Sequence, residues 1–225
     1  MELILDASSK VTRAGIASQG LLMWTSEPLP PKEHTRRLLP AIVTGLHATS
    51  STFDDVVLIV VALGPGPFNG LRVALSSAKG FAAARGAAIV GISTLEAEAY
   101  RCPPAIGTVR PILSAGRTGF ATALFAWQDG VWTPTEDARH VDAAEATRFL
   151  EEHVYLCGEI DALMELAPAS VAPTRCFAAA REPRLEVLAA LGWQRYSAGC
   201  TSSAAALQPE YARPPHITTP RERRP

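Results

Sequence analysis

The first apolar segments of this chain are short and are separated by polar residues. "LILD" ends at Asp6, "RAGIAS" follows a polar cluster, and "LLMW" follows Gly20. Runs of this length, divided by turn-forming residues, are typical of β-strands. The pattern therefore predicts a strand, a turn and then a hairpin at the start of the chain.

Between residues 32 and 50 the apolar positions change to the spacing of a helix. Leu38, Ile42 and Leu46 fall on one stripe, with Leu39 and Val43 beside it. Pro40 lies inside this pattern, and proline removes one backbone donor. We expect Pro40 to start the main helix or to kink it.

A strand–helix–strand unit follows. "VVLIVVAL" is apolar at nearly every position, which predicts a strand buried on both faces of a sheet. A helix is predicted after Asn69, then a second buried strand in "AAIVGIS" and a short helix in "TLEAEAY". This order is typical of a βαβ crossover and predicts a parallel pair of strands.

The second half restarts the pattern after the linker "RCPPAIG". Three consecutive strands are predicted in "TVRPILSAG", "GFATALFAW" and "GVWTP", and a fourth in "VYLCG". Two helices are predicted: "DAAEATRFLEEH", with Asp142 as N-cap, and "REPRLEVLAALGW", with a proline in its first turn and Gly192 as C-cap. We therefore expect two α/β lobes, residues 1–103 and 104–225, the second ending in an irregular basic tail.

Composition narrows the class of protein. The chain has 225 residues, 48% hydrophobic and 19% charged, so it can bury a substantial core. It has no apolar run of the roughly 20 residues that a transmembrane helix needs, and its N-terminus lacks the features of a signal peptide. We expect a cytoplasmic protein with no membrane contact.

Charge and cysteine content exclude two further kinds of site. The net charge of −1 argues against a protein that grips nucleic acid by itself. The one basic cluster is the tail, which is either a solvated end or a contact for phosphates; its members are Arg213, Arg221, Arg223 and Arg224. The four cysteines form no CxxC pair, so we expect reduced thiols and no structural zinc site.

Two segments resemble phosphate-binding loops. In "LDASSK", Asp6 ends a strand, as in actin-like and sugar-kinase-like ATPases, but Ala7 stands where such sites need glycine. We therefore favour the interpretation of Asp6 as an ordinary turn aspartate that closes the strand. The stretch "GPGPFNGLRVALSSAKG" matches neither a Walker loop nor GxGxxG, and Pro65 and Pro67 remove donors that a phosphate cradle requires. We therefore interpret it as a stiff turn that directs a helix.

The helix after that turn carries small residues on one stripe, Gly70, Ala74 and Ser77. Such a stripe indicates close packing, either inside this chain or against a helix of another chain. None of the five histidines forms an HxxxH or HExxH pair, and no GxSxG elbow is present. We expect no catalytic residue, no cofactor and no metal in this chain.

Five segments in this order resemble one known family. "LDASSK", "HTRRLLP", "VALGPGPFNGLRVALSSAKGFA", "IVGISTLEA" and "PEYAR" are similar to segments of the TsaB (YeaZ) family, whose members are partner subunits in the synthesis of threonylcarbamoyladenosine on tRNA. The match is best in the first half of the chain. This sequence departs from the family pattern at Pro67 and Asn69, where the family has Ser and Thr, and at Ser114, where the family has Asp.

The resemblance implies an α/β, actin-like (RNase H-like, ASKHA) fold with two lobes. It also implies a non-catalytic subunit that activates a TsaD-like paralogue. In that paralogue two histidines four residues apart bind a metal, and Thr94 and Glu98 occupy their places here. Because threonine is a poor ligand and one glutamate is not enough, the resemblance implies that the metal site is lost.

The family also implies where partners bind. The first two helices would form a four-helix interface with a TsaD-like protein. We expect Leu38, Ile42 and Leu46 to contribute from the first helix and Arg72, Ser76 and Lys79 from the second. Further implied partners are a TsaE-like ATPase, tRNA held indirectly, and a second copy of this chain when the TsaD-like protein is absent.

Two alternative functions stay open at this stage. A glycoprotease-type peptidase would need a nucleophile–base pair or a metal, and neither is visible in the sequence. An ATP-binding, sugar-kinase-like protein would need a donor-rich phosphate loop, for which "LSAGRTG" offers only Gly116 and Gly119.

Overall fold

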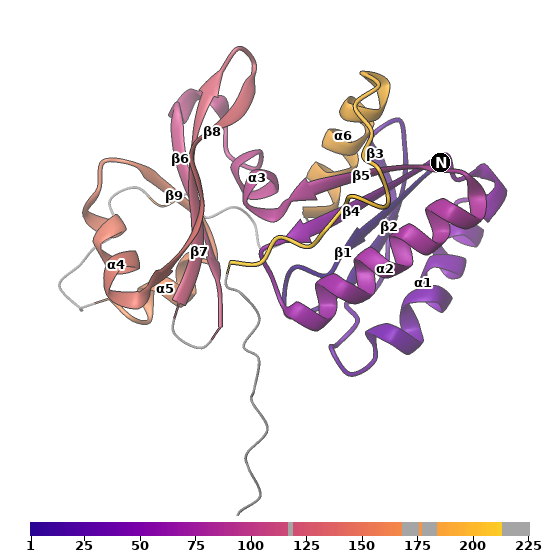
Figure 1. The fold of residues 1–225 in the computed structure, drawn as a ribbon, viewed down its shortest axis with the longest axis horizontal. Coiled ribbons are helices and arrows are strands. Elements are labelled where there is room, and N and C mark those ends of the chain that lie inside the picture. The colour runs from indigo at the N-terminus through magenta and orange to yellow at the C-terminus, as the bar shows by residue number, and fades with distance from the viewer. Residues whose placement is uncertain (117–118, 168–175, 177–183, 213–225) are drawn as a thin grey trace, which may run out of the picture.

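The computed structural model describes residues 1–116, 119–167, 176 and 184–212. The chain forms two lobes, each built around one sheet (Figure 1). Residues of both lobes line a cleft between them. None of the helices in these residues is long and apolar enough to cross a membrane. The predicted tail cluster, Arg213 to Arg224, lies outside the described residues.

The first lobe contains a five-stranded sheet in the order β3-β2-β1-β4-β5. Strand β1 pairs antiparallel with β2 and parallel with β4, and β4 pairs parallel with β5. The predicted hairpin and βαβ crossover are therefore confirmed. The bounds are β1 Glu2–Asp6, β2 Arg13–Ser18, β3 Leu21–Thr25, β4 Leu58–Gly64 and β5 Ala88–Ser93.

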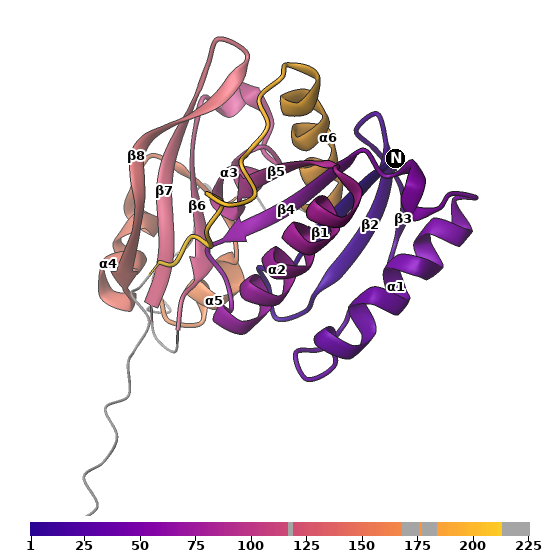
Figure 2. The ribbon, with the colours of Figure 1, turned by 45° about the vertical axis from the view of Figure 1, so that its right-hand side comes forward.

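Helices cover both faces of this sheet, which explains why β4 is apolar at nearly every position and why β1 is apolar from Leu3 to Leu5. Helices α1 (His34–Ala48) and α2 (Phe68–Arg85) lie on one face (Figure 2). Leu5 of β1 and Ile59 of β4 point toward these helices. The alternate residues Ile4 and Val60 pack on the other side, against α6.

Helix α1 begins six residues before Pro40, so the proline lies inside the helix rather than at its start. The hydroxyl of Thr44 donates to the carbonyl oxygen of Pro40 at 3.0 Å, where the chain continues helically. The stripe formed by Leu38, Ile42 and Leu46 is buried against the sheet.

The second lobe has a four-stranded sheet in the order β8-β7-β6-β9, with β9 parallel to β6. The four predicted strands are confirmed, although β8 extends well past "GVWTP". The side chain of Asp142 accepts a hydrogen bond from the Glu145 amide, which confirms the predicted N-cap of α4. The bounds are β6 Thr108–Ser114, β7 Gly119–Gln128, β8 Val131–Asp142, α4 Ala143–Arg148, β9 Tyr155–Gly158 and α5 Ile160–Met164.

Helix α6 (Arg184–Ser197) returns from the second half of the chain to pack on the first sheet, on the same side as α3 (Thr94–Ala99) (Figure 1). The predicted C-cap at Gly192 is wrong, because the helix continues past it. A Cβ at Gly192 would lie 2.3 Å from Cγ2 of Val60, so this glycine permits close helix–sheet packing. The proline predicted in the first turn lies outside the described residues.

After α6 the chain runs back along the first sheet toward the cleft. The Ser202 amide donates to the Ile89 carbonyl at 2.8 Å, and the Glu210 amide donates to the Leu63 carbonyl at 2.8 Å. The first lobe is thus completed by residues that follow the second lobe in sequence. The division of the chain at residue 103 stays a prediction.

Candidate functional site

The glycine-proline loop packs directly on the turn that follows β1. A Cβ at Gly66 would lie 2.6 Å from Cα of Ser8, so only glycine permits this approach of two backbone segments. Pro67 is the N-cap residue of α2 and its side chain accepts no hydrogen bond. This geometry supports the interpretation of a turn that fixes the start of α2.

The small-residue stripe of α2 is a packing surface within this chain. Gly70 and Ala74 are buried, and a Cβ at Gly70 would lie 2.8 Å from the carbonyl oxygen of Ala7. Ser77 is half-buried. Of the two interpretations of the stripe, internal packing is the one that the structure favours.

The six residues expected to bind a partner divide into two groups. Leu38, Ile42 and Leu46 are at most 3% exposed and form part of the first core, so they cannot contact a partner in this fold. That part of the expectation needs correction, because the apolar stripe of α1 faces its own sheet. On α2, Arg72 and Ser76 are exposed and Lys79 is half-exposed.

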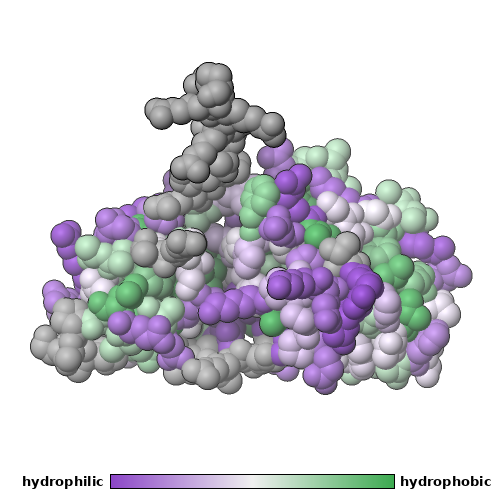
Figure 3. Space-filling model, turned by 90° about the horizontal axis from the view of Figure 1, so that it is seen from below, coloured by the Kyte–Doolittle hydropathy of each residue, from purple (hydrophilic) through white to green (hydrophobic). Residues whose placement is uncertain are grey.

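The outward-facing residues of α1 and α2 form what we call the outer α1–α2 surface. It combines apolar side chains with cations; its members are Arg36, Arg37, Leu39, Val43, Phe68, Arg72, Ser76 and Lys79. Arg37 pairs with Glu33 at 2.6 Å, whereas the guanidinium of Arg72 lies over the Phe68 ring at 5.0 Å. Seen from below, the coloured part of the protein surface intersperses hydrophilic and hydrophobic residues (Figure 3).

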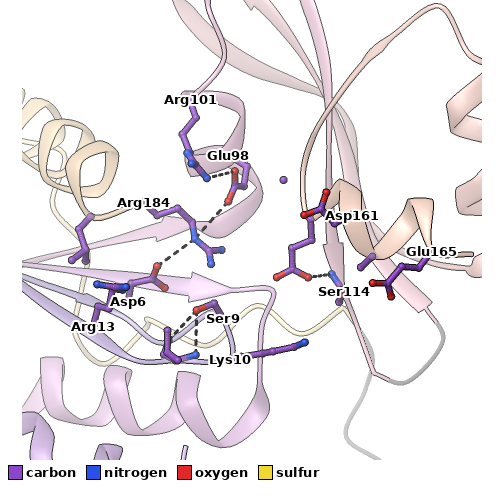
Figure 4. A pocket seen from close by; sticks show the side chains of 15 residues that line it. Asp6, Ser9, Lys10, Arg13, Glu98, Arg101, Ser114, Asp161, Glu165 and Arg184 are labelled. Carbon is purple, nitrogen blue, oxygen red and sulfur yellow. Dashed lines mark hydrogen bonds and ion pairs between the residues drawn. The ribbon is translucent and has the colours of Figure 1, made fainter. Parts of the chain in front are cut away.

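The cleft between the lobes contains a chain of buried ion pairs (Figure 4). The Nε atom of Arg184 lies 3.4 Å from Oδ2 of Asp6 and 3.5 Å from Oε1 of Glu98, and Glu98 also pairs with Arg101 at 3.0 Å. Burial acts to lower the pKa of the Arg184 guanidinium, but the surrounding carboxylates outweigh this effect and raise the pKa. The network joins the ends of β1, α3 and α6.

Asp6 has the bonding of a turn aspartate. Its Oδ1 accepts hydrogen bonds from the Ser8 amide at 2.9 Å and from the Ser8 hydroxyl, while Oδ2 faces Arg184. Both carboxylate oxygens are therefore engaged by protein groups.

Thr94 and Glu98 lie one helical turn apart on α3, and both are buried. Among the described residues, the hydroxyl of Thr94 has no hydrogen-bond partner, and the carboxylate of Glu98 contacts two guanidinium groups. Within the residues that the structure describes, no group of three or more histidine, cysteine, aspartate or glutamate side chains could hold a metal ion.

All four cysteines are free in the structure. Cys102 and Cys157 are buried in one apolar cluster between α3 and the second sheet, and each Sγ lies 3.7 Å from the carbonyl oxygen of Glu98. Burial raises the pKa of the Cys157 thiol. A thiol held in its protonated form in an apolar core is a poor nucleophile.

At the mouth of the cleft, the end of the described chain meets the start of α2. The rings of Phe68 and Tyr211 have centroids 5.0 Å apart. The two rings border a second cavity of about 600 Å³ that also includes Pro65 and Pro67. This is where the "GPGPFNG" and "PEYAR" segments, far apart in sequence, come together.

Comparison with known proteins identifies the family. The family model for TsaD, tRNA N6-adenosine threonylcarbamoyltransferase, matches residues 29–154. The chain belongs to this family. Along most of its length it is similar to the tRNA threonylcarbamoyladenosine biosynthesis protein TsaB of Bacillus subtilis, with 29% identity over 81% of this chain and 80% of that protein.

Other TsaB and YeaZ proteins agree with this assignment. TsaB of Escherichia coli is 29% identical over 41% of this chain and 40% of its own length. The solved structure of YeaZ from Pseudomonas aeruginosa superimposes with a TM-score of 0.73 at 21% identity, covering 93% of this chain and 98% of that one. The predicted resemblance to TsaB (YeaZ) and the predicted two-lobed, actin-like fold are confirmed.

Arg184 is the site residue that sequence reasoning missed. It comes from the second half of the chain, yet it bridges Asp6 and Glu98 of the first lobe. No local motif marks it, because the contact depends on α6 returning to the first sheet. Tyr211 belongs to "PEYAR", so a signal existed for its segment but not for its contact with Phe68.

Proposed function

We propose that this TsaB-like chain is a non-catalytic subunit of the system that makes threonylcarbamoyladenosine at position 37 of tRNA, and that it binds and activates a TsaD-like paralogue. Two observations together carry the proposal: the chain belongs to the family, and the described residues of its cleft lack the metal-binding side chains expected of the paralogue. At the two positions that resemble metal-ligand positions of the paralogue, this chain has a buried threonine and a glutamate already bound by two arginines.

The outer α1–α2 surface is the proposed contact with the TsaD-like protein. Arg72 and Ser76 are exposed there, and Leu39 is 51% exposed although it is a large apolar residue. Exposed apolar side chains beside cations suit a protein interface with an apolar centre and a charged rim. We therefore replace Leu38, Ile42 and Leu46 with the outward residues of α1 and keep Arg72, Ser76 and Lys79.

Other parts of the proposal follow from the same family. Without the TsaD-like protein, two copies of this chain pair through the same surface. A TsaE-like ATPase joins the complex, tRNA is held mainly by the other subunits, and the complex is cytoplasmic. The near-neutral charge of this chain supports an indirect role in tRNA binding.

The two alternative functions have less support. A peptidase needs an activated nucleophile, but Asp6 is bonded to Ser8 and Arg184, and the Cys157 thiol is buried with a raised pKa. A nucleotide would need amide donors near the β1 turn, but Gly66 packs on Ser8 at that place. We propose neither.

The test is complex formation with the TsaD-like protein of the same organism. Size-exclusion chromatography with light scattering is expected to give a 1:1 complex at micromolar concentration, and calorimetry its Kd. Arg72→Glu reverses a charge on the outer α1–α2 surface and should weaken binding by tenfold or more, about 1.4 kcal/mol. In a reconstituted reaction the same variant should reduce tRNA modification in proportion.

Arg148→Glu is the matched control. Arg148 is exposed on α4 of the other lobe, so the same reversal of charge should leave the Kd unchanged. The proposal fails if no complex forms at micromolar concentration. The choice of surface fails if both reversals weaken binding equally.

A further inference from the structure

The cavity between the lobes has walls of opposite charge. Its volume is about 540 Å³, within the range of small-molecule sites. The first-lobe wall, including α6, carries four cations among its carboxylates, whereas the β9–α5 wall carries only carboxylates (Figure 4). The cations are Lys10, Arg13, Arg101 and Arg184, and the facing carboxylates are Glu159, Asp161 and Glu165.

Arg184 lines this cavity and has one unused donor. Its Nε faces Asp6 and Glu98, but Nη1 is buried and has no hydrogen-bond partner among the residues that the structure describes. The guanidinium points into the cleft between the two walls (Figure 4). A buried donor without an acceptor is costly, so an acceptor on a ligand would remove a real penalty.

The opposite wall offers acceptors for a cationic group. Oε2 of Glu159 accepts a hydrogen bond from the Ser114 amide at 2.9 Å, which orients this carboxylate at the edge of the cavity. Glu165 is exposed on the same wall, one helical turn beyond Asp161. A ligand that reaches both walls therefore needs an anionic end and a cationic end.

The balance of charge excludes a polyphosphate as the preferred ligand. Four cations and five carboxylates line the cavity, which leaves it with a formal charge of −1. A triphosphate would gain the donor of Arg184 and the ammonium group of Lys10, but it would also meet five carboxylates. A zwitterion instead places each of its charges against the opposite wall.

The second cavity indicates the rest of the ligand. It adjoins the first through Ser9, Lys10, Ser114 and Glu159, which line both. Its other walls include Phe68 and Tyr211 together with the two loop prolines. An apolar side chain attached to the zwitterionic group would fit against this aromatic pair.

We propose that the cleft binds a zwitterionic α-amino acid with an apolar side chain. Its carboxylate accepts from Nη1 of Arg184, its ammonium group lies between Glu159 and Glu165, and its side chain extends toward Phe68 and Tyr211. This site shares Phe68 with the outer α1–α2 surface but otherwise lies in the cleft, and it goes beyond the proposed function as a binding partner.

Calorimetry on the full chain, with L-phenylalanine and L-leucine as probes, tests the proposal. Each is expected to bind at one site. 3-Phenylpropionate and phenethylamine keep the ring and one charge each, so each should bind at least about tenfold more weakly than phenylalanine. Magnesium ATP should not compete with either amino acid.

Variants then locate the site. Glu159→Gln and Glu165→Gln should each weaken binding about tenfold, because each removes a charge that faces the ammonium group. Glu186→Gln is the matched control: Glu186 is exposed on α6, does not line the cavity and should bind as the unaltered chain does. Circular dichroism confirms that each variant is folded.

The outcomes that overturn the proposal are equally specific. No saturable binding of either amino acid up to about 10 mM would mean that the free donor of Arg184 meets only water. Equal affinity for phenylalanine and its two single-charge analogues would show that the site does not require both charges of the ligand. Unchanged binding in both cleft variants would show that the amino acid binds at another place on the protein.

Discussion

The interlobe cleft and the outer α1–α2 surface are both rich in arginine, but they differ in whether those arginines are paired with carboxylates. In the cleft, Arg184 and Arg101 each contact the buried Glu98, and Asp6 completes the network. On the helices, none of the ion pairs found among the described residues involves Arg36, Arg72 or Lys79. Charge is thus neutralised within the fold at one place and left available at the other.

This difference separates two uses of a cation. A buried pair is strongly coupled to its partners, since removing one member leaves the other desolvated and unpaired. An exposed cation contributes little to stability but can still attract and orient another molecule. The comparison predicts that substitutions in the cleft act on folding, whereas substitutions on α1 and α2 act on association.

The largest expected effect comes from Arg184→Met. It leaves the carboxylates of Asp6 and Glu98 buried without their shared cation, so the free energy of unfolding should fall by about 3–5 kcal/mol. Urea denaturation followed by circular dichroism measures this change. Arg36→Met, on the outer α1–α2 surface, is the control and should leave the urea midpoint nearly unchanged. Equal loss in the two variants would contradict the comparison.

The two faces of α1 provide the next test. Ile42 is fully buried, so Ile42→Ala should lower the free energy of unfolding by about 2–5 kcal/mol through lost burial and a cavity. Leu39 is 51% exposed, so Leu39→Ala should change stability little and should weaken binding to the TsaD-like protein. If Leu39→Ala destabilises the isolated chain as much as Ile42→Ala does, the assignment of inner and outer faces is wrong.

This pair of residues also shows where sequence reasoning reached its limit. The helical spacing of Leu38, Ile42 and Leu46 correctly predicted a helix with an apolar stripe. It could not tell whether that stripe faces the chain's own sheet or another protein, because burial in a core and burial in an interface require the same side chains. The depth of the stripe below the surface depends on β1, β2 and α2, which lie elsewhere in the sequence.

The strands were predictable because each carries its own signal. β1 and β4 are apolar on successive positions, and both are buried on two faces as this pattern requires. The return of α6 had no such signal. Gly192 indicated a helix end, yet it is a contact with Val60 inside the helix, and a close approach of this kind becomes visible only when both elements are placed.

A medium effect is expected when salt is raised. The cations of the outer α1–α2 surface are exposed, so binding of the TsaD-like protein should weaken by about tenfold between low salt and 0.5 M sodium chloride. The ion pairs around Arg184 are buried and are screened much less. The urea midpoint of the isolated chain should therefore shift little over the same range, when measured by fluorescence. If the affinity for the TsaD-like protein does not change with salt concentration, the contact does not involve the cations of the outer α1–α2 surface.

The smallest expected effect concerns the ion pair between Arg37 of α1 and Glu33, the N-cap residue of that helix. A hydrogen bond from Arg37 lowers the pKa of the Glu33 carboxyl below its ordinary value. A lowered pKa in the folded state means that the pair stabilises the fold above the unfolded pKa, and that this contribution is lost as the pH falls through the folded pKa. NMR titration of the Glu33 side chain should show its pKa rising toward the ordinary value in Arg37→Met. Because the carboxyl is fully exposed, the acid unfolding midpoint of that variant should stay close to that of the unaltered chain. A large shift of the midpoint would mean that charge on α1 is coupled to folding as it is in the cleft, and the contrast between the two regions would no longer hold.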